Sequence, residues 1–513
     1  MHKLLSHKWL ILALLISVWA GRMLLTTKHF YTHDDIQVFR LNEYLECFDR
    51  GDLPCRWSPA LGKGYGYPLF NYYPPMIYVV PALIHLLGFS LITSLNLFMF
   101  LTFILAAWGM YNLVKALTER EDLAFLASAL YTLYPWHATN VFIRGVYGEN
   151  LAWSLAPWIF LTIFLHISKG RRGWLPPLFA LTFLTHIISS FLLVGLGIIW
   201  TVILTVIYHK PLLRTLFRLA GAIVVGVGIS AFFFIPAILE KGLVQSETMT
   251  QGYYAYSNHF VGLKQLFCDY TWVYGASYFG TPPEEMGFMV GHIHELLLAI
   301  GLIFGWLYFK KSSAFKLALS LLVLAVALLF MAHSKSTFIW SLLPPLAYVQ
   351  FPWRFIGWAG LPLVLSISLT FSALPLKIFR ALSWVAVVGL LIYSSTFFAP
   401  RGYDRYTDSD FVAGTLTANQ QVSSIYDYLP KTVKTIPEVY AKDSDYPTPI
   451  FYFPGWTAST PIQVDPSTGI IMGSPPGLVW KETPFRLSMD IISLISLSGY
   501  LFYLMYNKEH VKF

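Results

Sequence analysis

Charged side chains are scarce in this sequence of 513 residues. Only 12% of its residues are Asp, Glu, Lys or Arg, about half the share found in a typical soluble domain. Apolar residues make up 56% of the chain and aromatic residues 17%. So little charge excludes a soluble enzyme and predicts an all-α polytopic membrane protein. The excess of basic over acidic residues, 35 against 27, is typical of cytoplasmic loops, and we expect no nucleic-acid partner.

Cysteine is also rare, and the chain has no internal repeat or low-complexity tract. The three cysteines, Cys47, Cys55 and Cys268, do not have the spacing of metal ligands. Two alternatives stay open for Cys47 and Cys55: one disulfide, if their loop faces an oxidising compartment, or two unlinked thiols. The first apolar run resembles a signal peptide but lacks a small-residue cleavage site, and Arg22 interrupts its end. We therefore expect an uncleaved first transmembrane helix.

Apolar runs long enough to cross a bilayer, about 20 residues each, recur along the chain. Counting 74–89 among them would place the basic run 169–173 on the outer side, against the positive-inside rule. This stretch is short and proline-rich, so we expect it to lie in the membrane interface. About twelve spans remain: 8–27, 93–117, 122–137, 150–168, 174–187, 189–208, 213–239, 292–309, 314–332, 353–373, 379–399 and 488–506. Every inner loop between them is basic, and so is the tail: Lys115, Arg120, Lys169, Arg171, Arg172, Lys210, Arg214, Lys310, Lys311, Lys316, Lys377, Arg380, Lys508 and Lys512.

The outer side receives the long loops, while both termini are expected in the cytoplasm. We predict a transmembrane domain over 1–399, with interfacial helices in its first outer loop, 28–92. The segment 400–487 has clusters of Pro, Gly, Asp and Thr between short alternating runs such as "PIFYFPGW". This pattern predicts a small β-rich extracytoplasmic insert. A final transmembrane helix and a cytoplasmic tail occupy 488–513.

Two adjacent acids, Asp34 and Asp35, stand directly after the first predicted span. Ionisable groups at a membrane boundary are costly and usually serve a site or a pathway. One carboxylate could act as a general base toward an acceptor hydroxyl, or the two could bind a divalent cation such as Mg²⁺ or Mn²⁺. A third alternative is structural: the acids cap the amphipathic helix predicted over 36–48.

Two arginines near the outer ends of predicted spans each have a functional and a structural interpretation. Arg144 in "IRGVYGENLAW" either binds a phosphate through its planar guanidinium or pairs with Glu149. Arg354 in "FPWRFIGW" has the same alternatives. For Arg354 phosphate binding is favoured, because no acid lies near it in the sequence.

Histidines and an aromatic stretch supply further candidates for substrate binding. His186 in "LTHIISS" is either a site residue or a turn residue satisfied by its local backbone. The stretch "GHIHELLL", with His292, His294 and Glu295, resembles a metal-ligand cluster but is equally typical of a solvated helix start. Tyrosines of "GKGYGYPLFNYYPP" (62–75) line a cleft or form an interfacial belt. The candidate substrate-binding residues are His33, Tyr65, Asn71, Tyr72, Tyr73, Glu149, His186, His292 and Glu295.

Several motifs together resemble one family of bacterial membrane proteins. After "HDD" come "GDLPCRWSPALGKGYGYPLFNYYPP" (51–75), "RGVYGENLA", "LTHI", "FPWRF" and "YFPGW". From about residue 32 to residue 464 the chain is similar to proteins named as related to pyruvoyl-tetrahydropterin synthase, although no motif points to pterin chemistry. This group resembles the GT-C superfamily of glycosyltransferases, which take a sugar from a polyprenyl-phosphate carrier on the outer face of the membrane.

The resemblance implies a GT-C-like fold with an essential acid in the first outer loop, at the position of Asp34 or Asp35. It implies an inverting glycosyltransferase of the bacterial cytoplasmic membrane, with its active site on the outer face. Asp34 would activate the acceptor, Asp35 would be a second ligand or a cap, and Arg144 or Arg354 would meet the phosphate. The implied partners are a polyprenyl-phosphate sugar and an extracytoplasmic glycan, lipid or protein acceptor.

Two other functions stay open at this point. One is a non-catalytic envelope scaffold that presents the insert. The other is a transporter or flippase of lipid-linked sugar, against which stand the lack of an inverted repeat and the gathering of polar residues at one face.

Overall fold

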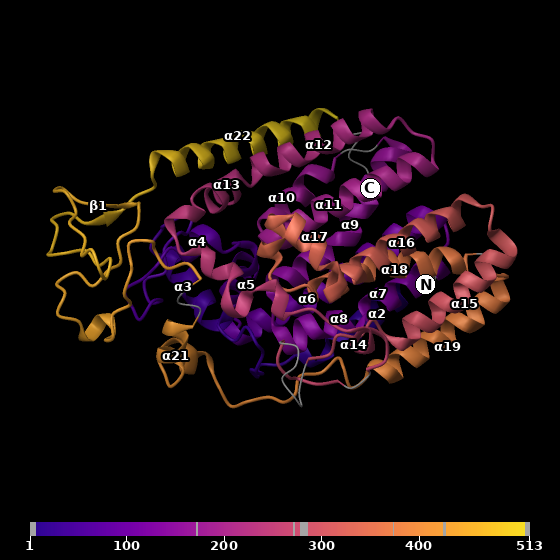
Figure 1. The fold of residues 1–513 in the computed structure, drawn as a ribbon, viewed down its shortest axis with the longest axis horizontal. Helices are drawn as coiled ribbons and strands as arrows, with labels where there is room; N and C mark the ends of the chain where they lie inside the picture. The colour runs from indigo at the N-terminus through magenta and orange to yellow at the C-terminus, as the bar shows by residue number, and fades with distance from the viewer. Residues whose placement is uncertain are drawn as a thin grey trace.

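Long apolar helices form the greater part of the protein in the computed structural model (Figure 1). The structure describes residues 7–170, 173–269, 272–277, 286–372, 374–423 and 427–507, so Arg171, Arg172, Lys508 and Lys512 of the predicted basic segments lie outside the described residues. Within these ranges, nine helices have the length and composition to cross a bilayer. They are α6 (Leu91–Thr118), α9 (Tyr147–Lys169), α11 (Ile187–Ile207), α12 (Leu212–Ile229), α15 (His292–Phe309), α16 (Ser313–Ala332), α18 (Arg354–Phe371), α19 (Leu376–Ser394) and α22 (Pro484–Tyr506). Each overlaps a predicted span, and the predicted helical membrane fold is confirmed.

Three other predicted spans are shorter helices. α2 (Lys8–Gly21) has 14 residues, α7 (Glu121–Thr132) has 12 and α10 (Leu175–Phe183) has 9. A helix rises about 1.5 Å per residue, so none of these three alone reaches across a hydrocarbon core of about 30 Å. α7 is almost entirely buried and packs against α2, α6 and α18. Neighbouring helices, rather than lipid, therefore surround it.

The helices differ sharply in how much surface they bury. Every residue of α18 is buried, and this helix packs against α16, α15 and α7. By contrast, α22 leaves most of its apolar side chains exposed and runs beside α12 at the edge of the bundle (Figure 1). An exposed apolar face is the surface that a helix presents to lipid. Ser230 separates the end of α12 at Ile229 from the start of α13 (Ala231–Leu239), so the predicted span 213–239 is divided in two.

The first outer loop contains three helices: α3 (Gln37–Asp49), α4 (Leu69–Tyr72) and α5 (Met76–Leu86). α5 is the short proline-containing segment that was expected to lie in the interface. After α3 the chain turns back, and a disulfide joins Cys47 to Cys55 with 5.9 Å between their Cα atoms. Of the two alternatives left open for these cysteines, the structure contains the disulfide.

The segment 400–487 lies at one end of the bundle, beside the first-loop helices (Figure 1). It contains α20 (Asp408–Val412), α21 (Thr417–Val422) and a small antiparallel sheet of β1 (Trp456–Thr457) and β2 (Val479–Trp480). Turns and bends make up most of the rest. The remaining short helices are η1 (Arg22–Leu24), α8 (Pro135–Ala138), η2 (Thr139–Arg144), η3 (Lys241–Leu243), η4 (Ser246–Thr250), η5 (Gly252–Tyr254), η6 (Tyr256–Asn258), α14 (Leu263–Phe267), η7 (Ser334–Ser336), α17 (Thr337–Leu342), η8 (Pro344–Val349) and η9 (Ala441–Asp443).

Candidate active site

The loop that carries the two acids is fixed by backbone hydrogen bonds to η2, a single turn of π-helix. The backbone N–H of His33 donates to the carbonyl of Ile143 at 2.9 Å, and that of Asp34 donates to the carbonyl of Arg144 at 3.0 Å. π-Helical turns are rare and occur often at functional sites. This pairing sets the backbone of Asp34 directly beside that of Arg144.

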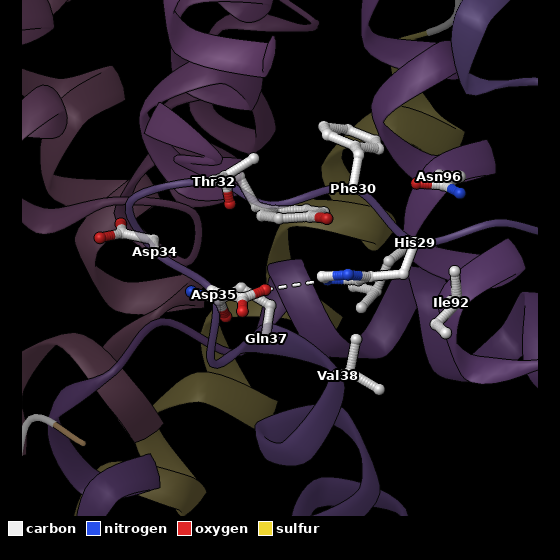
Figure 2. Close-up of a pocket in the computed structure, with 11 residues that line it drawn as sticks. His29, Phe30, Thr32, Asp34, Asp35, Gln37, Val38, Ile92 and Asn96 are labelled. Carbon is white, nitrogen blue, oxygen red and sulfur yellow. Dashed lines mark ion pairs between the residues drawn. The ribbon is translucent and has the colours of Figure 1, made fainter. Parts of the chain in front are cut away.

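Asp34 and Asp35 point in different directions (Figure 2). The Asp35 carboxylate lies 2.8 Å from His29 Nε2, and the other ring nitrogen of His29 lies 2.7 Å from Asp404. The Asp34 carboxylate makes no hydrogen bond or ion pair with any residue in the described part of the chain. Both acids line one pocket, together with His29, Phe30, Thr32, Gln37, Val38, Ile92, Leu95, Asn96 and Tyr147.

The structure also bears on two alternative roles of these acids, capping of a helix and binding of a shared cation. α3 begins at Gln37, its N-cap is Ile36, and no side chain caps it, so neither acid is a helix cap. A cation shared by both carboxylates requires their oxygens to converge, whereas these carboxylates diverge. In the described segments no group of three or more His, Cys, Asp or Glu is arranged to hold a metal ion. The pair therefore does not fit a shared Mg²⁺ or Mn²⁺ site.

Glu149 binds both candidate arginines. Its carboxylate accepts two hydrogen bonds of 2.9 Å from Arg144 and one of 3.1 Å from Arg354. Arg144 also donates to Asn140 at 2.6 Å, and its guanidinium lies 4.5 Å from the centre of the Trp353 ring. All three charged groups are buried. One carboxylate neutralises only one of the two guanidinium charges, so the group keeps a net positive charge.

These contacts remove the ground for one inference drawn from the sequence. Arg354 was favoured as a phosphate ligand because no acid lies near it in the sequence, but the fold brings Glu149 to it from α9. Arg354 further donates to the backbone carbonyl of Val349 at 2.6 Å. For Arg144, the mutual ion pair with Glu149 is the alternative that the structure contains. Protein acceptors thus already use much of the hydrogen-bonding capacity of both arginines.

Asp34 lies in the electric field of three arginines. Burial raises the pKa of its carboxyl above the ordinary aspartate value, while Arg144, Arg40 and Arg354 act to lower it and Glu149 acts to raise it. The net direction is upward, which makes the carboxylate a stronger base than an exposed aspartate. Arg40, on α3, was not among the residues singled out from the sequence. The sequence does place Arg40 three residues after Gln37, on the same face of the predicted helix, and this position could have marked it as a candidate.

Two of the candidate histidines lie near this group. His186 is the N-cap of α11, where its ring accepts a hydrogen bond from the backbone N–H of Ser189 at 3.2 Å. Burial lowers the pKa of His186 to about 3, helped by the charges of Arg354 and Arg144. The N-cap hydrogen bond of His186 is the local structural role expected for a turn residue, and the residue also lies next to the buried charges. The ring of His33 contacts the carbonyl of Gly275 at 3.0 Å.

His292 and Glu295 belong to a separate region at the start of α15. His292 lies 2.9 Å from the hydroxyl of Tyr393, and His294 lies 2.9 Å from the carbonyl of Leu130. One carboxylate oxygen of Glu295 is buried without a hydrogen-bond partner. No contact in the described residues joins this group to Asp34.

The aromatic stretch of the first outer loop divides between two places. Tyr65 stacks on Phe451 and Tyr72 stacks on Tyr428, both in the insert. Asn71 and Tyr72 also bind Glu240, at the end of α13. Tyr65 and Tyr72 thus join the loop to the insert, and Asn71 joins it to α13. None of the three lines the Asp34 pocket. Tyr73 does reach the charged site, because the Arg40 guanidinium lies over its ring.

The fold is similar to that of a solved enzyme. Two solved structures of the mycobacterial arabinofuranosyltransferase AftD match it. One, of a mutant form, gives a TM-score of 0.51 at 18% identity and covers 78% of this chain and 29% of its own. The other gives 0.49 at 19% identity and covers 77% and 27%. The first supports the predicted GT-C-like fold; this chain spans less than a third of the length of either structure.

A family comparison identifies the chain itself more closely. The model of the 6-pyruvoyl-tetrahydropterin synthase related domain, described as a membrane protein, matches residues 70–400. The chain therefore belongs to this family of membrane proteins, as its motifs indicated. No curated protein matches it.

Proposed function

We propose that this protein is a membrane glycosyltransferase that moves a sugar from a polyprenyl-phosphate donor to an extracytoplasmic acceptor. The proposal rests on one observation: the Asp34 carboxylate has no partner among the described residues and lies in the electric field of three buried arginines. A base for the acceptor and positive charge for a leaving phosphate are the two groups that this reaction needs. The GT-C-like fold agrees with it.

The proposed reaction is a single displacement at the anomeric carbon. The acceptor hydroxyl attacks that carbon from the side opposite the phosphate, and its proton passes to the Asp34 carboxylate. The bond between the anomeric carbon and the phosphate oxygen breaks, and the phosphate leaves with the bonding electron pair. The configuration of the sugar is inverted. Asp35 takes no part in this step, because His29 holds it.

The disulfide favours an outward-facing site. Cys47 and Cys55 belong to the same outer loop as Asp34, and disulfides persist in oxidising compartments outside the cytoplasm. The basic inner loops predicted from the sequence require the same orientation. We therefore assign the site to the extracytoplasmic face of the bacterial cytoplasmic membrane.

A transfer assay on two neighbouring variants tests the proposal. The full-length protein in lipid nanodiscs is supplied with radiolabelled polyprenyl-phosphate sugars and a crude envelope glycan acceptor. The Asp34→Asn variant keeps the size of the side chain but removes the base, and should lose roughly a hundredfold or more of the transfer rate. Asp35→Asn, the matched control one residue away, should retain most of it. Undiminished transfer by Asp34→Asn, with equal folded protein, would refute the assignment of the base.

A further inference from the structure

Arg40 is a buried cation without a countercharge in contact. Only 3% of the residue is exposed, and its guanidinium forms no ion pair with any residue in the described ranges. Its Nε is buried without a hydrogen-bond partner. A buried charge without a partner in contact is costly in general. The other arginines at the site differ in this respect, since both are bound to Glu149.

The first outer loop builds a rigid seat for this guanidinium. It lies 4.7 Å from the centre of the Tyr73 ring, within the range of a cation–π interaction. The hydroxyls of Tyr67 and Tyr78 lie beside it. Tyr78 in turn donates to the side chain of Gln37 at 3.0 Å. A long, flexible side chain is thereby held in one orientation before any ligand arrives.

Gln37 connects this seat to the Asp34 pocket. Gln37 lines that pocket together with Asp34 (Figure 2), and Arg40 follows it by one helical turn on the same face. Arg40 also lies close enough to Asp34 to act on its charge. The other titratable groups that act on Arg40 are Tyr67, Tyr73, Tyr78 and Asp427.

We propose that Arg40, rather than Arg144 or Arg354, is the residue that binds the phosphate of the lipid-linked donor, as a preformed anion site next to Asp34. This inference rests on the proposed function. A guanidinium with an unused N–H group matches the geometry of phosphate oxygens, and an incoming phosphate supplies a countercharge in direct contact with Arg40. Arg144, Arg354 and Glu149 then serve as a fixed positive group that holds the Asp34 loop.

Binding of the leaving group, without turnover, tests this assignment. The full-length protein in phosphatidylcholine nanodiscs is titrated with undecaprenyl phosphate, and binding is followed by displacement of a photoreactive polyprenyl phosphate. Arg40→Gln should bind it about tenfold to a hundredfold more weakly, the loss expected for a charge-assisted hydrogen-bonded contact. Arg40→Lys, which keeps the charge but loses the fork, should fall between this variant and the wild type. Arg50→Gln, at the exposed end of the same helix, is the matched control and should bind normally.

Three results would overturn the proposal. Equal binding by Arg40→Gln and wild type, with only the acid limb of the transfer rate moved to higher pH, would make Arg40 a residue that tunes Asp34 and no phosphate ligand. Competition by inorganic phosphate at the same concentration as the lipid would assign the site to free phosphate. Equally weak binding by a folded Arg144→Gln variant would return the role to the Glu149 group. If Arg40→Gln does not fold, Arg40→Lys gives the answer alone.

Failure of this proposal is distinct from failure of the glycosyltransferase assignment. Binding of polyprenyl phosphate requires no sugar transfer, so an Arg40-dependent site stands even where no acceptor is found. Conversely, transfer that depends on Asp34 but not on Arg40 would support the glycosyltransferase assignment and refute only the phosphate site at Arg40.

Discussion

At the scale of single residues, the two adjacent acids have separate tasks. Asp34 faces the arginines without a partner in the described chain, whereas Asp35 is joined through His29 to Asp404 of the insert. The sequence could predict that an acid at this position matters, since ionisable groups at a membrane boundary are rare. It could not separate the two acids, because the difference depends on Asp404, which lies far along the chain.

The ion pair of Glu149 and Arg354 was likewise beyond prediction from the sequence. Their ion pair joins positions that are 205 residues apart, so no sequence window contains both. Arg40 was missed for a related reason: its seat forms only when Tyr67, Tyr73 and Tyr78 fold back over α3. Arg144 and Glu149, which are near in sequence, could be paired in advance.

The His29 group should make stability depend on pH. Burial lowers the pKa of His29, but contacts with Asp35 and Asp404 outweigh it, and the net pKa is raised. Burial also raises the pKa of Asp35. A raised histidine pKa means that its stabilisation is complete below about pH 6.5 and is lost as pH rises through the higher pKa of the folded protein. The raised Asp35 pKa acts in the same direction.

Thermal unfolding of wild type and His29→Gln checks this dependence. Between about pH 6 and pH 8 the advantage of the wild type should shrink, from an initial value of about 1.5–3 kcal/mol for charge-assisted hydrogen bonds. A difference in Tm that stays constant or grows over this range would show that His29 is not charged in the folded protein.

At the scale of elements, hydrophobic length predicts the long helices well and the short ones poorly. The nine long helices are themselves apolar enough to be read from the sequence. α10 ends after 9 residues, and α12 and α13 meet at Ser230. Such breaks depend on neighbouring helices that satisfy the freed backbone groups, and hydrophobicity does not record those neighbours.

The junction between η2 and α9 lies against the loop that carries Asp34 and helps to position it. Gly145 there has φ of +65°, and a Cβ on it would come 2.2 Å from the hydroxyl of Thr32, in the loop that leads to Asp34. A side chain at this position would be strained by its backbone and would also push the acid-bearing loop away.

Gly145→Ala should therefore reduce both stability and transfer. The left-handed conformation alone costs an alanine about 1–2 kcal/mol, and the displaced loop should lower the transfer rate further. Gly195→Ala in α11 is the matched control, because its Cβ meets nothing within 4 Å and its φ is ordinary; it should be neutral or stabilising by up to about 1 kcal/mol. Thermal unfolding and the transfer assay measure both effects, and equal behaviour of the two variants would contradict this role for Gly145.

At the scale of the whole molecule, the first outer loop and the insert form one structure at the end of the helix bundle (Figure 1). Arg56 of the loop binds Glu482 and Asp490, and Arg486 binds Glu240 and the carbonyl of Pro454. Both arginines are fully buried. Composition could predict that 400–487 is a separate segment, but not that an ion pair from Arg56 joins it to the loop and a hydrogen bond from Arg486 joins it to α22.

The orientation of the molecule in the membrane is open to a direct test. Cys268 is exposed and is the one free cysteine in the chain, in a loop expected on the outer side. A membrane-impermeant maleimide should label it in intact spheroplasts, and Cys268→Ser should abolish the signal. Lys311→Cys in the Cys268→Ser background, within a predicted inner loop, should react only after permeabilisation. Labelling with the opposite pattern would place the candidate site on the cytoplasmic side.

The roles of Asp34 and Arg40 can be seen directly in a structure of the full-length protein in nanodiscs with a non-transferable polyprenyl-phosphate sugar bound. We expect the phosphate on the Arg40 guanidinium and the anomeric carbon facing the Asp34 carboxylate, with the lipid chain leaving between transmembrane helices. A donor bound elsewhere, or with Asp34 turned away from its sugar, would rule out these two roles.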